Sequence, residues 1–295
     1  MAVIETPVST PSARRAKPRR PARTLTTKRL TLAILGYLVA IVFILPYVEM
    51  VISALRPKNE LLGRDFVPKH WDWSNFTTLW STGFGSSLGA SLEIAGGATL
   101  LVLLVALPAG YYTARRRFRG RAFFLLLVLA TQMFQPAALL VGIQREFTSF
   151  NLPSPVLSLI LVNAGFNMAF AVWILNAYFS SIPPELEQAA MVDGTTRMGA
   201  VGRITLPLAM PGVVTAVIFT FISAWNELLV ALTLSGSGNN ANVPLTVAIN
   251  NYIGQYSIDW GHLFAASVIA TVPVIILFAF IEGKVVGGLT AGSIK

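Results

Sequence analysis

The sequence predicts an all-α integral membrane protein with six transmembrane helices. Two features of its composition support this fold class: 54% of the 295 residues are hydrophobic and only 12% are charged. The mean hydropathy of +0.66 agrees with them. A soluble domain carries about 25% charged residues, which cover its surface with polar groups. A chain this apolar is therefore expected to lie in a lipid bilayer.

Six stretches reach the roughly 20 apolar residues that a spanning helix requires. They cover residues 31–55, 88–113, 122–143, 156–179, 208–234 and 262–282. The first is too long for a signal peptide, and no small-x-small cleavage site follows it. The residues before it, 1–29, are rich in Pro, Ser, Thr and Arg, and we expect them to form a disordered basic tail. Residues 30–295 then make up the membrane domain.

The positive charge gathers beside the spans, and this sets their direction. Eight basic residues precede residue 30, and five more lie in ARRRFRGR at 114–121. Because positive charge flanking a span stays in the cytoplasm, both clusters and both termini are predicted to be cytoplasmic. The net charge of +9 is thus explained by the membrane and not by a nucleic-acid partner. The loops at 56–87, 144–155 and 235–261 are predicted to face outward.

A polar segment, residues 180–207, separates the fourth and fifth predicted spans on the cytoplasmic side. Its first part reads SSIPPELEQAAMVDG and carries the signals of a short helix. Ser180 or Ser181 can cap its start, and Pro183 and Pro184 fit a first turn. Gly194 can end it in a left-handed conformation.

This predicted helix has a narrow apolar face made by Leu186, Ala189 and Ala190, at spacings i, i+3 and i+4. Glu185 and Glu187 lie near the positive end of its dipole. A flat alanine face lets a second surface approach closely, although alanines can equally pack against the chain's own loops. A second short helix is expected after Gly194, and its predicted buried edge comprises Met198, Val201 and Ile204.

The spacing in this segment resembles a known signature. Apart from one position, EQAAMVDGTTRMGAVGRITLP resembles E-A-A-x3-G-x9-I-x-L-P, the signature of the coupling loop of ABC importer membrane subunits. It is more similar still to L-E-x-A-A-x-x-D-G-[AT] of the carbohydrate-type branch, the family of the second membrane subunit of maltose-type importers. The pattern departs at Gln188, where the general signature has glutamate. AWNELLVAL at 224–232 and GGLTAGSIK at 287–295 also resemble that family.

The resemblance implies a type I ABC importer permease fold in a bacterial cell membrane, with a cytoplasmic coupling helix that docks on an ATPase. The residues that it assigns to coupling are Glu187, Gln188, Ala189, Ala190, Asp193, Gly194, Ile204, Leu206 and Pro207. The implied partners are a second homologous permease, two cytoplasmic ATPase subunits and an extracytoplasmic solute-binding protein. The chain has no G-x-x-x-x-G-K-[ST] phosphate loop. We therefore expect it to be no enzyme and to bind no cofactor, with ATP and Mg²⁺ held by the ATPase.

Amide side chains within the spans are the candidate lining of a substrate path. They are Gln132, Gln135, Asn163, Asn167 and Asn226. Polar groups inside spans usually face a bundle interior or a cavity. Together with Phe134 and Phe166 they offer the hydrogen bonds and aromatic faces that a sugar needs. The competing interpretation is that these amides bond neighbouring helices to each other. The resemblance implies a solute among disaccharides, oligosaccharides, sugar alcohols and glycerol-phosphate esters, and these residues do not choose among them.

Two other classes of function were weighed. An ion-coupled secondary transporter predicts inverted repeats and paired carboxylates, and the sequence has no obvious example of either. Glu227 near the end of the fifth span could relay protons, but a structural or gating role is favoured. An intramembrane enzyme lacks a Ser-His pair or a carboxylate dyad in the spans. No metal site is predicted, because there is no cysteine and His70 lies far from His262 in the sequence.

Overall fold

The computed structural model describes residues 27–60, 66–149, 154–235 and 243–291. Within these ranges the regular structure is helical, apart from one isolated β-bridge between Ile253 and Ile258. The chain divides into two compact units, residues 1–47 and 48–295. Helix α1 (Thr27–Ala54) begins in the first unit, and its apolar side chains there, such as Phe43, are exposed. Residues 1–26 of the predicted tail lie outside the described ranges.

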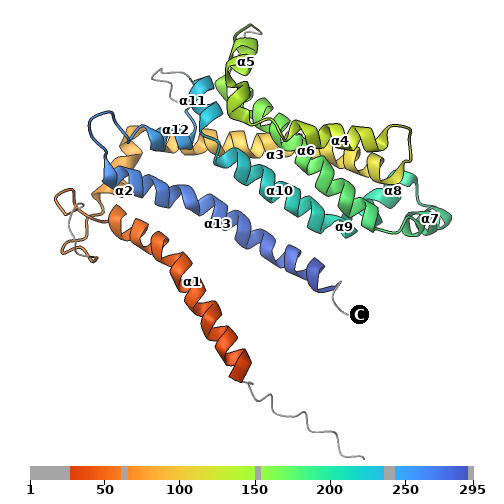
Figure 1. Cartoon of the computed structure of the whole chain (residues 1–295), viewed down its shortest axis with the longest axis horizontal. Coiled ribbons are helices and arrows are strands. Elements are labelled where there is room, and N and C mark those ends of the chain that lie inside the picture. The colour runs from red at the N-terminus through yellow and green to blue at the C-terminus, as the bar shows by residue number, and fades with distance from the viewer. Residues whose placement is uncertain (1–26, 61–65, 150–153, 236–242, 292–295) are drawn as a thin grey trace, which may run out of the picture. The chain divides into compact units, whose positions relative to one another are not determined.

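Four described helices are long and apolar enough to cross a membrane, and two bent helix pairs bring the number to six if each pair is one span. The four are α1, α3 (Phe84–Arg115), α6 (Pro155–Ser181) and α13 (Trp260–Ala291) (Figure 1). The fold class predicted from the sequence is confirmed. The predicted third and fifth spans, however, are not straight helices.

The predicted span 122–143 is broken into α4 (Arg121–Thr131) and α5 (Pro136–Ser149), which bend by 91°. Pro136 explains the break between α4 and α5, because a proline disfavours helical geometry in the residue before it, here Gln135. A continuous helix over 122–143 was therefore a wrong expectation.

The predicted span 208–234 is also interrupted. Helix α10 (Met210–Trp225) ends before residue 226, and α11 (Leu229–Ser235) starts a new helix. Polar side chains supply the alternative hydrogen bonds at this break. Glu227 Oε1 accepts a hydrogen bond from the amide of Val230 at 2.6 Å, which caps α11. The structural role favoured for Glu227 agrees with this contact.

The predicted outer loops contain short helices that bind the ends of the spans together. They are α2 (Ser74–Leu79), the 3-10 turn η1 (Trp80–Thr82) and α12 (Leu245–Asn250). His262 at the start of α13 lies 2.8 Å from the Thr78 hydroxyl on α2 and 2.7 Å from Asp259 Oδ2. The amide of Leu245 donates to Ser91 on α3 at 2.7 Å.

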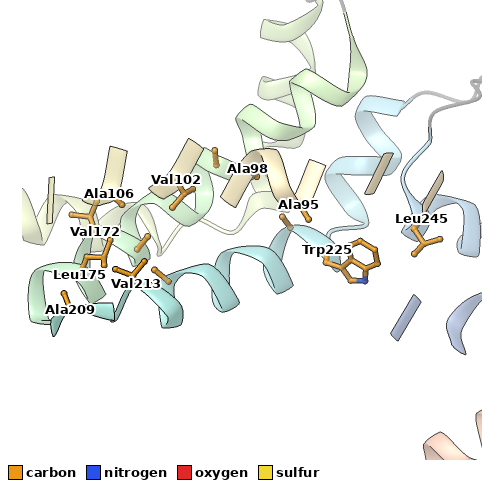
Figure 2. Close-up of a cluster of buried hydrophobic side chains, with 14 of the residues drawn as sticks. Ala95, Ala98, Val102, Ala106, Val172, Leu175, Ala209, Val213, Trp225 and Leu245 are labelled. Carbon is orange, nitrogen blue, oxygen red and sulfur yellow. The ribbon is translucent and has the colours of Figure 1, made fainter. Parts of the chain in front are cut away.

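The core is built by small side chains where α3, α6 and α10 meet. Ala95, Ala98, Val102 and Ala106 form one stripe on α3, at spacings of three and four residues (Figure 2). They pack in one cluster with Val172 and Leu175 of α6 and Val213 of α10. In a membrane, small residues of this kind let helices approach closely, so that van der Waals contact holds the bundle together.

Gly110 marks a close approach of α3 to the backbone of α6. A Cβ added there would lie 2.8 Å from Leu175 Cβ and 3.2 Å from the Asn176 backbone nitrogen. Gly96 on the same helix has nothing within 4 Å of the same added atom. The two glycines therefore form a matched pair for testing the close contact.

We predict that Gly110→Ala lowers the stability of the purified chain by about 1–3 kcal/mol, because α3 and α6 must separate to admit the methyl group. Gly96→Ala should leave it unchanged or slightly raise it, because alanine has the higher helix propensity. Thermal midpoints in one detergent measure both effects. Equal midpoints for the two variants would contradict this packing.

Candidate functional site

The segment between α6 and α10 contains the predicted helix, α7 (Glu185–Val192). Gly194 follows with φ of 85°, as the sequence predicted. The amide of Thr195 donates to the Ala190 carbonyl at 3.0 Å, and that of Gly194 donates to the Met191 carbonyl at 3.1 Å. This pair of bonds is a Schellman cap, which needs the left-handed residue that glycine supplies. Asp193 is the residue between the helix and this glycine.

The start of α7 differs from the prediction. Ser180 and Ser181 belong to the end of α6, and the Ser181 hydroxyl donates to the Tyr178 carbonyl instead of capping α7. Pro184 is the residue before the first turn and makes no side-chain cap. The amides of Leu186 and Glu187 donate instead to the carbonyls of Pro183 and Pro184, at 3.4 and 3.2 Å, so the first turn needs no side-chain cap.

The buried side of α7 includes a carboxylate, and its exposed side includes apolar side chains. Glu187 and Ala190 are buried, whereas Leu186, Ala189 and Val192 are exposed. The exposed fraction is 42% for Leu186 and 87% for Val192. The three residues of the predicted apolar face are thus divided: Leu186 and Ala189 are exposed, whereas Ala190 points inward and packs against the chain itself. Gln188 is also exposed.

The buried Glu187 joins three segments of the chain. Its Oε1 lies 2.8 Å from both Nε and Nη2 of Arg115, at the end of α3. Its Oε2 accepts a hydrogen bond from the Tyr111 hydroxyl at 2.8 Å, and Oε1 accepts one from Thr205 at 2.7 Å. Arg115 Nη1 also donates to the Ile182 carbonyl at 2.7 Å. We call Glu187, Arg115, Tyr111 and Thr205 the carboxylate anchor.

The anchor keeps Glu187 ionised although it is only 5% exposed. Burial alone raises the pKa of its carboxyl, but the hydrogen bonds from Thr205, Tyr111 and Arg115 and the charge of Arg115 outweigh this. The pKa of Glu187 therefore lies below its usual range. The sequence predicts Glu187 near a helix dipole and Arg115 among the orienting charges, but it does not indicate that Tyr111 and Thr205 bind this carboxylate. The one local sign of the ion pair is that Arg115 stands at the end of an apolar helix.

The second half of the segment returns to the bundle in short pieces. They are α8 (Arg197–Ala200), a π-helical turn (Val201–Thr205) and α9 (Leu206–Leu208). Met198 is 80% exposed, which contradicts its predicted place on a buried edge. Ile204 and Leu206 are half-buried, and Leu206 packs against the core cluster. Pro207 is exposed. This piece bends by 70° into α10.

The amides proposed for a substrate path have different surroundings. Asn163 is buried, and its amide nitrogen donates to the Leu159 carbonyl. Asn167 donates to the Asn163 carbonyl, and Asn226 to the Ile222 carbonyl. Gln132 is exposed and donates to the Phe166 carbonyl at 2.8 Å, which connects α4 to α6. Gln135 is exposed in the break between α4 and α5.

A pocket of about 410 Å³ lies where the α4–α5 break meets α6. Phe134 and Phe166 line it together with Thr131 and four further residues: Leu139, Ile143, Val162 and Gly165. The two aromatic rings named from the sequence thus face one cavity. None of the five candidate amides lines it, although Gln132 bonds to the backbone of Phe166. In the described part of the chain, no three His, Cys, Asp or Glu side chains gather as a metal site would require.

A bundle of membrane-crossing helices with an anchored polar helix at one end defines the class of an importer's membrane subunit. The chain belongs to the family described as "Binding-protein-dependent transport system inner membrane component", which it matches over residues 106–286. It is an ABC importer permease, a transport subunit and not a catalytic one. This membership leaves the ion-coupled alternative without support.

Sequence relatives of the chain are also permease subunits of transport systems. The chain is 38% identical over 70% of its length to the sulfoquinovosyl glycerol transport system permease protein of Agrobacterium fabrum, covering 71% of that protein. It is 30% identical over 91% of its length to the trehalose/maltose transport system permease protein of Thermococcus litoralis, covering 97% of it. A solved bacterial ABC transporter involved in alginate import has a chain of the same fold. The TM-score is 0.72 at 20% identity, over 90% of this chain and 99% of that one.

The carboxylate anchor predicts a large effect for Glu187→Gln. The neutral amide leaves the buried Arg115 guanidinium without its counter-charge, and the loss of one partner of a buried pair costs about 3 kcal/mol. Glu185→Gln, on the exposed surface of the same helix, is the matched control and should change little. Thermal midpoints of the two variants at pH 7 measure the difference.

The sign of the pH dependence follows from the lowered pKa of Glu187. Its stabilising effect is complete at neutral pH and is lost as the pH falls through that lowered value, below the ordinary range of about 4.3. The stability advantage of the wild type over Glu187→Gln should therefore shrink in acid. An advantage that grows on acidification would contradict an ionised Glu187.

Proposed function

We propose that the exposed side of α7 is the surface on which a cytoplasmic ATPase subunit docks. The observation that supports this most strongly is that apolar side chains lie on the exposed side of the helix while the carboxylate of Glu187 is turned inward. Exposing Leu186, Ala189 and Val192 to water is unfavourable unless a partner covers them. The narrow side chain of Ala189 permits close approach, and Asp193 and Gly194 end the helix sharply. Gln188, Ile204, Leu206 and Pro207 complete the proposed coupling segment.

We propose further that the chain and a second homologous permease enclose a path for a carbohydrate or related polyol. The names of the relatives support a solute of this class, since they refer to sulfoquinovosyl glycerol and to trehalose and maltose. The pocket lined by Phe134 and Phe166 adds aromatic faces on which a sugar ring can pack. Of the amides, Gln132 and Gln135 are exposed at the neighbouring break and Asn226 at the next one. Asn163 and Asn167 bond within α6.

In this proposal an extracytoplasmic solute-binding protein delivers the solute, and two ATPase subunits hold ATP and Mg²⁺. The membrane is a bacterial cell membrane, with both termini in the cytoplasm. The ion pair of Arg115 with Glu187 supports this orientation, because it brings the arginine-rich turn and α7 to the same end of the bundle. In this cysteine-free chain, a cysteine at Lys69 should react with an impermeant maleimide from outside, and one at exposed Met198 should not. Reaction of Met198→Cys alone would reverse the orientation.

Ala189→Trp tests the docking surface. The bulky ring on the exposed side should block the ATPase groove and leave the fold intact. We expect tagged Ala189→Trp to retain at most about a tenth of the ATPase subunits that the wild type retains, at equal membrane levels. A loss of this size corresponds to about 1.4 kcal/mol of binding. Ala190→Trp is the contrasting variant, because Ala190 is buried and its replacement should lower the thermal midpoint of the chain itself.

The same variants test the function when the importer is reconstituted with its ATPase and solute-binding protein. ATP hydrolysis by the wild type should rise with a sugar or polyol from a panel and not with amino acids. Ala189→Trp should abolish this rise. Full stimulation of ATP hydrolysis in Ala189→Trp would contradict α7 as the docking site. Stimulation by amino acids alone would contradict a carbohydrate or polyol as the solute.

A further inference from the structure

The turn between α3 and α4 carries more positive charge than the carboxylate anchor uses. Arg115 pairs with Glu187, but four more arginines follow it, at positions 116, 117, 119 and 121. Arg116, Arg117 and Arg119 are exposed, and none of the four forms an ion pair within the described residues. Four uncompensated guanidinium groups within six residues make a strongly electropositive turn.

The backbone of this turn adds hydrogen-bond donors. Gly120, with φ of 92°, precedes α4 and offers no side-chain cap. The amide of Arg121 donates to the Phe118 carbonyl, and that of Phe124 donates to the Gly120 carbonyl. Between them, the amides of Ala122 and Phe123 have no such partner among the described residues. The start of an 11-residue helix with free amides attracts an anion.

The side chain of Arg121 provides an independent observation at the same place. Its Nε is buried and has no hydrogen-bond partner in the described chain. A buried donor without a partner is unfavourable, because it has lost its water without gaining an acceptor. Arg121 as a whole is half-buried, so its guanidinium group has hydrogen-bonding capacity that the described chain does not use.

Apolar side chains continue from the turn along α4. Tyr112 and Phe118 lie with their ring centroids 5.8 Å apart, and both are exposed. On α4 itself Phe123 is 69% exposed and Leu126 is 65% exposed, and no residue of this helix is buried. The anion-binding features are thus followed directly by an uncovered apolar surface.

We propose that the turn 116–121 and the start of α4 bind an anionic phospholipid of the cytoplasmic leaflet. The phosphate lies against the guanidinium groups of Arg119 and Arg121 and the amides of Ala122 and Phe123. The acyl chains run along Phe123 and Leu126. This inference rests on the proposed function for the orientation of the turn, and it is independent of the solute and of ATPase docking.

The combination of features selects a lipid over other anions. A charge that serves only to orient a span needs neither free helix amides nor an adjoining apolar surface. A free phosphate ion would use the donors but leave Phe123 and Leu126 uncovered. A guanidinium binds phosphate through two parallel hydrogen bonds, whereas lysine acts as a point charge. Basic groups at this depth attract anionic lipid by about 1 kcal/mol each.

The test measures the thermal midpoint of the full chain, purified with its partner subunits in detergent, after addition of phosphatidylglycerol, phosphatidylcholine or inorganic phosphate. We expect phosphatidylglycerol to raise the midpoint by about 3 °C or more and the other two to have little effect. Arg119→Gln with Arg121→Gln should abolish the rise. The matched control, Lys69→Gln with Arg145→Gln, removes the same charge from exposed sites elsewhere and should keep it.

Several outcomes would overturn the proposal. They are an equal rise with phosphatidylcholine, an equal rise with inorganic phosphate, and a full rise in the Arg119→Gln, Arg121→Gln variant. If phosphatidylglycerol raises the thermal midpoint of the chain alone but not of the complex with the ATPase, the turn contacts the ATPase and not a lipid. If the variant with both glutamines is not produced in the membrane, the variant with Arg119→Lys and Arg121→Lys replaces it, because lysine retains the positive charge that orients the span. This pair should show a smaller rise than the wild type, and an undiminished one would count against the site. ATP hydrolysis measured in parallel separates this result from the proposed function.

Discussion

The carboxylate of Glu187 lies where the end of α3, the helix α7 and the return to α10 meet, and each of these depends on it for a fixed position. An eight-residue helix is too short to be stable by itself in water, because the cost of forming its first turn is spread over too few hydrogen bonds. Tertiary contacts must therefore hold α7. A buried carboxylate is costly when alone, but here Arg115, Tyr111 and Thr205 all contact it. The anchor fixes the helix while leaving its outer side free.

This arrangement has a mechanical consequence for an importer subunit. A push or pull on the outer side of α7 reaches α3 through Arg115 and Tyr111, and reaches the start of α10 through Thr205. Helices α3, α6 and α10 share a buried core in which alanine and valine side chains predominate (Figure 2). Closely packed interiors transmit displacement instead of absorbing it. We therefore expect the anchored helix and the three-helix core to move together, whereas the described residues of α4 and α5 have no fully buried side chain.

Much of the fold could be predicted from the sequence, because span length, flanking charge and a glycine at a helix end are local signals. The six apolar regions and the left-handed Gly194 are examples. The direction of α7 could not be predicted in this way. A hydrophobic pattern assigns apolar residues to the interior, but here the interior partner is an arginine 72 residues away. The polar contact therefore determines which side of α7 is buried, and it turns Ala190 inward together with Glu187 while Leu186 stays exposed. A pattern within one helix contains no information about a partner that distant.

The broken spans and the polar residues within them have a common explanation. A break inside a bilayer frees backbone groups that lipid cannot satisfy, so nearby side chains must do so. Gln132 bonds to the carbonyl of Phe166 beside the α4–α5 break, and Glu227 caps the helix after the α10 break. Glu227 thus satisfies an amide at its own break, whereas Gln132 joins the α4–α5 break to the continuous helix α6. The first break also opens the pocket lined by Phe134 and Phe166. Helix bonding and cavity formation, which are alternative interpretations of these polar residues in the sequence, thus occur side by side here. Gln132 holds the α4–α5 break against α6, and residues on both sides of that break line the cavity.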